Sequence, residues 1–258
     1  FEVTLIVDGP PPSPEAGYRD HEDDRIWEVT GLPNADLARL IAEAGIEVLV
    51  DLNGYSHADR LPLLAFRAAP VQVAWNGMYG TTGFSALDAV VGDRWTIPPE
   101  EERFHSEPVH RVGGTYLPFD MFYETPPVAP PPSLAAGRIT FGSLSAGYKI
   151  TGPTVALWAA VLRACPGARL LLANRLLDRP GNRDALLARF AAEGIRAERL
   201  LLRGGAPHEE YLRLYDEVDI ALDTIPYAGG TTTVEALWQG VPFVTLAGDR
   251  WASRTSRS

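Results

Sequence analysis

The sequence predicts an α/β protein made of two Rossmann-like halves with parallel sheets, and three observations carry this prediction. Short apolar strand patterns alternate with helical patterns along the chain, an order that produces βαβ units and right-handed crossovers. The strand patterns are almost entirely apolar, as expected where helices cover both faces of a sheet. A proline-rich stretch at 125–137 interrupts the alternation near the middle of the 258 residues.

The first half, residues 1–124, alternates between strand and helix. We expect a strand at 1–7, a helix at 36–44, and strands at 47–52, 71–75 and 89–93. The stretch 125–137 contains five prolines. Because proline fixes φ and lacks an N–H, this composition predicts an extended linker and a domain boundary.

The second half, residues 138–258, repeats the alternation more regularly. Its first helix opens at Pro153, a residue that the first turn tolerates, and ends before Pro166. Strands are expected at 138–142, 168–173, 200–203, 218–223 and 241–246, and helices at 155–164, 182–193, 208–217 and 231–239. A ligand in such a fold lies at the carboxyl ends of the strands, here in a cleft between the halves.

Both ends of the sequence look incomplete. The chain begins directly in a strand pattern, and residues 248–258 stop where a helix is expected to start. We therefore expect a fragment of a longer protein.

Composition and charge exclude several classes of protein. The net charge of -10 argues against a nucleic-acid partner, which requires a basic surface. No run approaches the roughly 18–20 apolar residues of a membrane helix, and no signal peptide is visible. The single cysteine, Cys165, excludes an internal disulfide and fits the reducing cytoplasm.

One basic residue stands out by its type. Of 23 basic residues, only Lys149 is a lysine. Most surface positions accept either arginine or lysine, but a site that needs a compact ammonium does not. Lys149 follows a strand end and precedes a helix, where an ammonium could neutralise a pyrophosphate and stabilise a nucleotide leaving group. The alternatives are a solvated loop lysine and chance survival of one lysine.

A second motif follows the strand at 218–223. A glycine-containing loop leads into a helix near Thr231, and unpaired N–H groups at a helix start bind phosphate. Gly229 and Gly230 allow close approach of the main chain, and Thr231 and Thr232 add hydroxyl donors. Glu235 lies one turn later, where its carboxylate could accept the hydroxyls of a ribose. The alternative is a capping threonine with a capping-box-like glutamate.

A third, weaker motif is the spacing Gly77, Gly80 and Gly83 after the strand at 71–75, together with residues 53–57. It predicts a loop of close approach that faces the cleft, although most such loops are only turns.

Together these motifs resemble the GT-B glycosyltransferases of the O-GlcNAc-transferase and SPINDLY type, family 41. The segment DTIPYAGGTTTVEALWQGVPFVTLAG at 223–248 is very similar to the nucleotide-binding segment of the family, and FGSLSAGYKI at 141–150 resembles its F-x-x-x-N-x-x-x-K-I segment. VDLNGY at 50–55, APVQVAW at 69–75 and GTTG at 80–83 resemble signatures of the N-terminal lobe. The resemblance covers essentially the whole chain.

The resemblance implies inverting, metal-independent transfer of a sugar from a nucleotide diphosphate sugar to Ser or Thr of a protein or peptide, with no cofactor. It implies that Lys149, Thr231 and Thr232 hold the diphosphate, preceded by Gly230, and that Glu235 holds the ribose. Ala206 and His208, in GAPHEEY at 205–211, correspond to contacts with the base, and Gly77 lies near the donor sugar. The family's N-lobe histidines and TPR repeats belong to segments upstream of residue 1.

The chain departs from the O-GlcNAc transferases at several positions. Gly230 replaces a histidine, as in the SPINDLY branch; His208 replaces a lysine, and Glu235 an aspartate. Ser145 and Ala146 replace an asparagine and a glutamine ahead of Lys149. The donor therefore stays open between UDP-GlcNAc, favoured here, and GDP-fucose. We expect His105 and His110 to lie on the surface, in a polar loop.

Two further hypotheses remain open. A nucleotide-sugar epimerase of the same two-lobed fold would need carboxylates aimed at the sugar ring, and no such pair is visible. The second hypothesis is that the chain is a fragment that binds nucleotide but has no activity of its own.

Overall fold

The computed structural model describes residues 1–12, 21–77, 79–121 and 123–258. The chain divides into two compact units, Phe1–Tyr116 and Leu117–Ser258. The stretch predicted as a linker, 125–137, belongs to the second unit. It is irregular up to residue 132, and its last part forms the short helix α3 (Ser133–Ala136).

The first unit contains two parallel sheets. β1 (Thr4–Val7) pairs with β2 (Arg25–Glu28), apart from the main sheet. The main sheet has the order β3 (Val48–Asp51), β4 (Val71–Ala74), β5 (Ala89–Asp93), β6 (Val109–Val112). The helices of this unit are α1 (Asn34–Glu43) and α2 (Leu61–Ala65), with 3₁₀ turns η2 (Gly54–Arg60) and η3 (Pro99–Phe104).

The sequence did not predict β2, α2 or β6. β2 and β6 each mix charged and apolar residues over four positions, so neither has the apolar run of a covered strand. The expectation that His105 and His110 share a polar surface loop is wrong. His110 is exposed but lies within β6, and His105 is half-buried, with Nδ1 3.3 Å from the carbonyl oxygen of Glu101.

The second unit is built on one parallel sheet, and its strands occur where the sequence predicted them. Their order is β11 (Phe243–Val244), β10 (Ile220–Leu222), β7 (Thr140–Ser143), β8 (Arg169–Ala173), β9 (Leu200–Arg203). The chain starts in the middle at β7, moves outward through β8 to β9, and then crosses to β10 on the other side. The strand order therefore reverses between β7 and β10, and such a switch point is where ligands bind in open α/β sheets.

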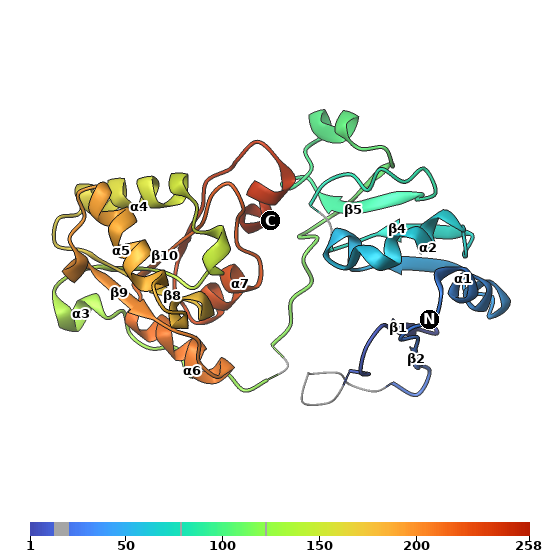
Figure 1. The fold of residues 1–258 in the computed structure, drawn as a ribbon, viewed down its shortest axis with the longest axis horizontal. Coiled ribbons are helices and arrows are strands. Elements are labelled where there is room, and N and C mark those ends of the chain that lie inside the picture. The colour runs from blue at the N-terminus through green and yellow to red at the C-terminus, as the bar shows by residue number, and fades with distance from the viewer. Residues whose placement is uncertain (13–20, 78, 122) are drawn as a thin grey trace. The chain divides into compact units, whose positions relative to one another are not determined.

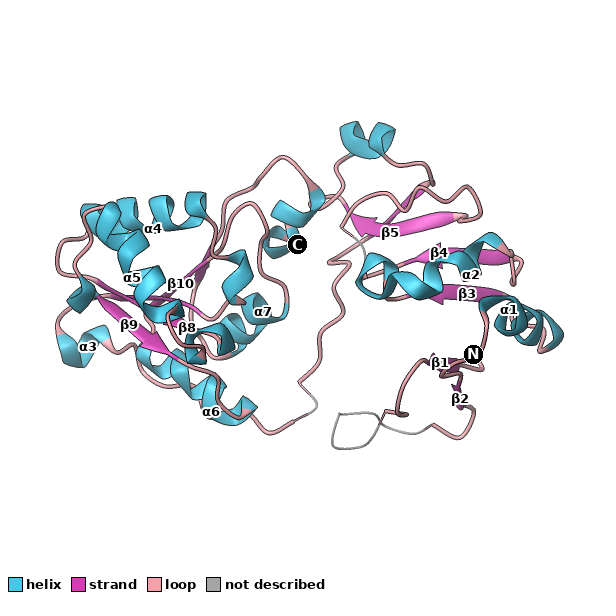
Figure 2. Ribbon diagram, in the orientation of Figure 1, coloured by secondary structure: helices cyan, strands magenta, loops and turns pink. Residues whose placement is uncertain are grey.

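Four longer helices cover this sheet: α4 (Gly152–Ala164), α5 (Asn182–Ala192), α6 (His208–Arg213) and α7 (Thr231–Trp238). The connecting 3₁₀ turns are η4 (Gly147–Lys149), η5 (Arg175–Asp178), η6 (Ala197–Arg199), η7 (Leu214–Glu217), η8 (Trp251–Ser253) and η9 (Thr255–Arg257). In Figures 1 and 2, α4 and α5 lie above the strands and α6 lies below them. The predicted start of α4 is confirmed: Pro153 lies in its first turn, and Thr151 caps it by accepting from the N–H of Thr154.

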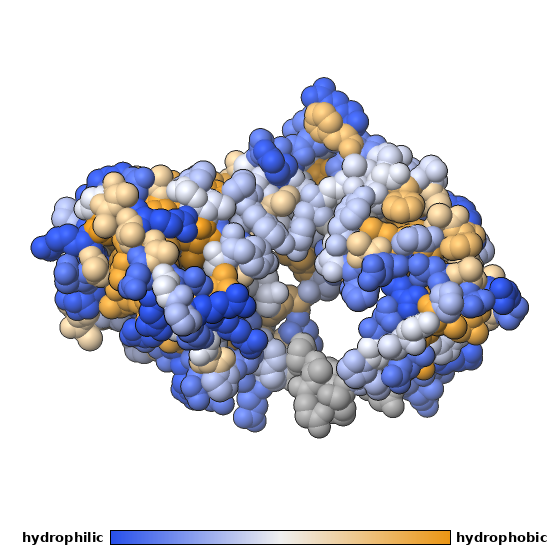
Figure 3. Space-filling model, in the orientation of Figure 1, coloured by the Kyte–Doolittle hydropathy of each residue, from blue (hydrophilic) through white to orange (hydrophobic). Residues whose placement is uncertain are grey.

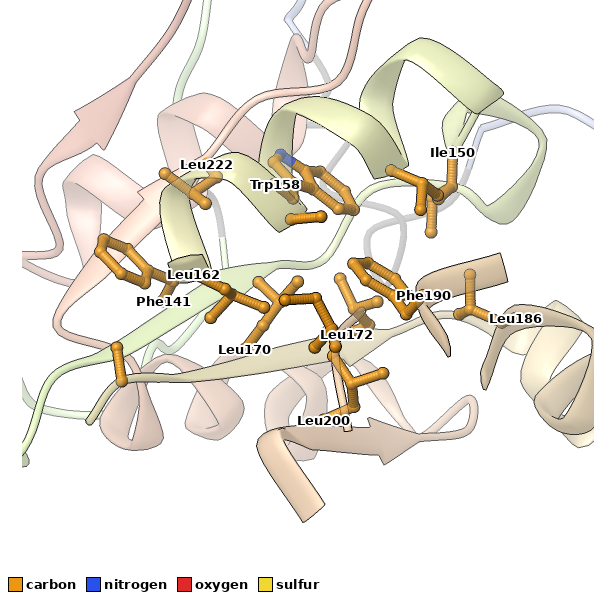
Figure 4. Packing of buried hydrophobic residues seen from close by; sticks show 14 of the residues in the cluster. Phe141, Ile150, Trp158, Leu162, Leu170, Leu172, Leu186, Phe190, Leu200 and Leu222 are labelled. Carbon is orange, nitrogen blue, oxygen red and sulfur yellow. The ribbon is translucent and has the colours of Figure 1, made fainter. Parts of the chain in front are cut away.

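Alternate residues of β8 serve the two faces of the sheet. Leu170 and Leu172 pack with Trp158 of α4 and Phe190 of α5 (Figure 4). Leu171 packs on the opposite face, in a cluster with helices α6 and α7. Because successive side chains of a strand point to opposite faces, the run of three leucines at 170–172 fits a sheet covered on both sides.

The exposed surface shows no continuous apolar band on the face drawn in Figure 3, where hydrophilic residues surround small apolar groups. Within the described residues, the structure contains no helix of the length and hydrophobicity that crossing a membrane requires.

Substitution of Leu172 by alanine tests the two-sided packing. Leu172 is 0% exposed in β8, whereas Leu134 in α3 is 79% exposed. We expect Leu172→Ala to lower the free energy of unfolding by about 2–5 kcal/mol, because it removes buried methyl groups and leaves a cavity. Urea unfolding followed by tryptophan fluorescence measures the change. The matched variant Leu134→Ala should shift it by less than about 0.5 kcal/mol, and equal losses in both variants would contradict the packing described here.

Candidate functional site

Three of the segments singled out in the sequence meet at one edge of the second unit's sheet. Residues 144–149 follow β7, residues 204–208 follow β9, and residues 223–230 follow β10. Since all these strands are parallel, their carboxyl ends lie at the same edge. The segments after β7 and β10 flank the switch point.

Lys149 reaches across the switch point to the loop that follows β10. Its Nζ donates to the carbonyl oxygen of Ala228 at 2.8 Å and lies 3.8 Å from the centre of the Tyr227 ring. Burial lowers the pKa of the Lys149 ammonium, and the nearby carboxylate of Asp223 opposes this shift. Lys149 is therefore half-buried and held on two sides, unlike a solvated loop lysine.

Asp223 shapes the loop that Lys149 contacts. Its Oδ1 accepts from the N–H groups of Thr224 and Gly229, both at 2.8 Å, and its Oδ2 accepts from the Thr245 hydroxyl at 2.6 Å. A Cβ at Gly229 would collide with the hydroxyl of Thr233. The loop therefore folds back tightly before α7 begins.

Helix α4 and its N-cap residue Thr151 also support this loop. The hydroxyls of Thr151 and Thr154 donate to the carbonyl oxygen of Ile225 at 2.6 and 2.7 Å. The indole N–H of Trp158 donates to the carbonyl oxygen of Asp223 at 3.0 Å. These hydrogen bonds from α4 and its N-cap residue hold the loop in place without a ligand.

Helix α7 begins without a side-chain cap. Its N-cap residue is Gly230, which has no side chain to accept from the first turn. The N–H of Thr233 donates to the carbonyl oxygen of Gly230 at 3.0 Å, whereas N–H groups at the very start of a helix have no acceptor within it. The alternative of a capping threonine with a capping-box glutamate is therefore not what the structure shows. Thr231 is exposed and Thr232 half-buried at this start.

Glu235 lies one turn into α7 and is buried, with its side chain 4% exposed. His208, the first residue of α6, places Nε2 3.4 Å from Oε1 of Glu235. The hydroxyl of Tyr123 also bonds to the carboxylate of Glu235. Burial raises the pKa of Glu235 to about 7, although the bond from Tyr123 lowers it.

The sequence reasoning missed the tyrosines that surround these groups. Tyr215 donates to the carbonyl oxygen of Thr232 at 2.8 Å, and Tyr211 donates to those of Leu144 and Ala173. The spacing of Tyr211 and Tyr215 would have placed both on one face of a helix. Tyr123 and Tyr227 lie in irregular segments with no periodic pattern to reveal them.

The other predicted residues lie as follows. Ala206 is half-buried in the loop between β9 and α6, two residues before His208. Gly77 belongs to the first unit and follows β4, where a Cβ would overlap the backbone of Asn53. This close approach requires glycine. Across the described ranges, no group of three or more His, Cys, Asp or Glu residues could hold a metal ion.

Comparison with known proteins gives a consistent match. The model of the family "Glycosyl transferase family 41" matches residues 24–122 and 132–258. The "Probable UDP-N-acetylglucosamine--peptide N-acetylglucosaminyltransferase SPINDLY" of Oryza sativa subsp. japonica is 35% identical over 225 residues, which cover 86% of this chain and 24% of that protein. The related SEC protein of Arabidopsis thaliana is 27% identical over 246 residues, covering 92% of this chain and 25% of its own length. The chain thus spans about a quarter of the length of these curated relatives.

Solved structures agree on the architecture. A mutant of the Thermobaculum terrenum O-GlcNAc transferase matches 100% of this chain and 49% of its own, with a TM-score of 0.85 and 35% identity. Anabaena Alr3699/HepE, solved in complex with UDP and glucose, matches 95% of this chain and 81% of its own with a TM-score of 0.54. At 11% identity, that second likeness shows the fold alone. The predicted α/β fold with parallel sheets is confirmed.

The variant Glu235→Gln tests the state of the buried carboxyl. In the unfolded chain this carboxyl ionises near 4.5, but in the folded chain it ionises near 7. As the pH rises between these values, the unfolded state loses its proton first, so the free energy of unfolding falls by about 2–3 kcal/mol. Glutamine cannot titrate, so this part of the pH dependence should vanish.

Urea unfolding of both proteins between pH 5 and pH 8 measures the difference. We expect the stability of Glu235→Gln relative to the parent chain to increase steadily over that window and to level off above it. A difference that does not change with pH would show that Glu235 is ionised throughout.

Proposed function

The chain belongs to glycosyl transferase family 41, and we propose that it is part of a protein O-glycosyltransferase. In the proposed reaction a sugar, GlcNAc, passes from a nucleotide diphosphate sugar to a Ser or Thr hydroxyl of a protein or peptide. The reaction inverts the configuration at the anomeric carbon, C1, of the sugar and uses no metal or cofactor. One observation carries the proposal: the Lys149 ammonium reaches the loop that leads into the uncapped start of α7.

This arrangement suits a diphosphate leaving group. An ammonium has three N–H donors, so the bond to Ala228 leaves two for phosphate oxygens. The N–H groups at the start of α7 and the hydroxyls of Thr231 and Thr232 are further donors, and the helix start carries partial positive charge. As the acceptor hydroxyl oxygen bonds to C1 of the sugar, its proton passes to the solvent, and the bond from C1 to the β-phosphate oxygen breaks so that the nucleoside diphosphate leaves. These donors would stabilise the negative charge that develops there.

The remaining predicted residues fit the nucleoside and sugar ends of the same donor. The carboxylate of Glu235 would accept the ribose hydroxyls, and Ala206 and His208 would contact the base. The contact between His208 and Glu235 supports this, since it brings the two groups to one place. Gly77 would allow the donor sugar to approach the backbone of the first unit.

GlcNAc is the sugar that the relatives favour, because the SPINDLY and SEC proteins are both named as N-acetylglucosaminyltransferases. Fucose from GDP-fucose is the second candidate. Gly230 favours this candidate, because O-GlcNAc transferases have a histidine at this position and the SPINDLY branch has none.

The full activity belongs to a longer protein. The chain spans about a quarter of its curated relatives, so we propose that TPR repeats and the N-lobe histidines of the family precede it. Alone, it would bind nucleotide with little or no transfer. A single cysteine, Cys165, suits the cytoplasm as the place of the reaction.

Substitution of Lys149 by alanine tests the proposed role of the ammonium. In the full-length protein we expect Lys149→Ala to lower the transfer rate at least about 100-fold, because it removes a donor aimed at the leaving group. Transfer of labelled sugar to a peptide measures the rate, and circular dichroism checks the fold. The control Arg138→Ala removes an exposed cation before β7, at the opposite edge of the sheet, and should leave the rate unchanged. Full activity of Lys149→Ala would refute the role.

The identity of the donor is tested by offering each candidate separately. Incubation of the full-length protein and an acceptor protein with UDP-GlcNAc should add one N-acetylhexosamine per site, and GDP-fucose should add nothing. Intact-mass spectrometry distinguishes the two products. Addition of fucose instead would select the second candidate, and release of free nucleotide without a glycosylated acceptor would contradict both.

A further inference from the structure

The surroundings of Glu235 contain more than the family resemblance explains. Its carboxylate is almost completely buried, yet no arginine or lysine pairs with it among the ion pairs of the described chain. A buried carboxylate that no arginine or lysine neutralises depends on the hydrogen bonds and contacts of its neighbours. Tyr123 from the irregular segment before α3 and His208 from α6 contact it, and Tyr211 from α6 and Tyr215 from η7 are near enough to feel its charge.

The hydroxyls of the three tyrosines have different hydrogen-bond partners. The hydroxyls of Tyr211 and Tyr215 donate to backbone carbonyl oxygens of other segments. Tyr123 instead bonds to the carboxylate itself. Its ring also meets the ring of His208 edge to face, with the centroids 4.7 Å apart and the planes at 89°. One side chain therefore touches both the group proposed for the ribose and the group proposed for the base.

We propose that Tyr123 is a positioning residue for nucleoside recognition. Its hydroxyl fixes the carboxylate of Glu235 so that this group accepts the hydroxyls of a ribose, and its ring fixes the imidazole of His208. This inference rests on the proposed function, because it needs a nucleoside diphosphate at the site. The ligand class is a ribonucleoside diphosphate, distinguished from its dideoxy analogue by the two ribose hydroxyls.

The geometry gives a reason for a tyrosine at this position. A carboxylate oxygen can accept more than one hydrogen bond, so the bond from Tyr123 orients Glu235 and leaves capacity for a ligand. A lysine or arginine would neutralise the carboxylate with a full charge and compete more strongly with the ribose. An apolar residue would leave the carboxylate without this donor and free to turn.

The experiment compares Tyr123→Phe with the parent chain. Phenylalanine keeps the ring against His208 and removes only the hydroxyl. Calorimetry measures the Kd of UDP, of GDP and of their 2′,3′-dideoxy analogues, and the readout is the selectivity for ribose over dideoxyribose. In the parent chain we expect a selectivity of at least about tenfold, because hydrogen bonds to a charged group are strong.

In Tyr123→Phe the selectivity should fall at least about threefold, with little change in the Kd of the dideoxy analogue. The control Arg138→Ala removes an exposed side chain before β7, at the opposite edge of the sheet, and it should keep the parent selectivity. The pH profile gives a second readout. Ribose selectivity should rise with pH as Glu235 ionises. The bond from Tyr123 lowers the pKa of Glu235, so Tyr123→Phe should move this rise to higher pH. A purely structural role of Tyr123 would not move it.

A double-mutant cycle shows whether Tyr123 acts through Glu235. If it does, Tyr123→Phe should cost no further selectivity in a chain that already carries Glu235→Gln. Additive losses, or parent selectivity in Tyr123→Phe, would overturn the inference. A parent chain that binds UDP or GDP without selectivity for ribose would also overturn the inference, but it would leave the proposed diphosphate site intact. A parent chain that binds neither UDP nor GDP would instead contradict the proposed function.

Discussion

The hydrogen bond from Lys149 to the carbonyl oxygen of Ala228 joins segments that are 79 residues apart in the chain. It can form because β7 and β10 are neighbours in a parallel sheet, so the segments that follow them leave the same edge. Asp223 holds the loop closed, and the ring of Tyr227 lies under the ammonium. The cation and the loop that leads into α7 are thereby brought together by the fold itself, before any ligand contributes. In the proposed function, donors preorganised in this way would stabilise the leaving group.

The second unit was largely predictable because its signals are local and strong. The apolar run 170–173 in β8 needs cover on both faces, and Pro153 and Gly240 mark a helix start and a helix end. The first unit was less predictable. β2 and β6 are short and carry charged residues, so their strand character comes from pairing with neighbours rather than from their own composition.

The same distinction applies to the candidate site. Lys149 stood out by its type, and the Gly-Gly-Thr-Thr run predicted where α7 begins. The depth at which Glu235 is buried, and the contacts that Tyr123 and Tyr227 make, depend on how distant segments pack. A tyrosine in an irregular segment has no spacing that reveals its partner, so only the folded chain shows this part of the site.

A crystal structure of this chain with UDP or GDP bound tests whether Lys149 and the start of α7 hold the same diphosphate. We expect oxygens of one diphosphate to lie within about 3 Å of both Lys149 Nζ and the N–H groups at the start of α7, as in ordinary hydrogen bonds. A nucleotide bound with its phosphates away from either group would show that the ammonium and the helix do not bind the same ligand.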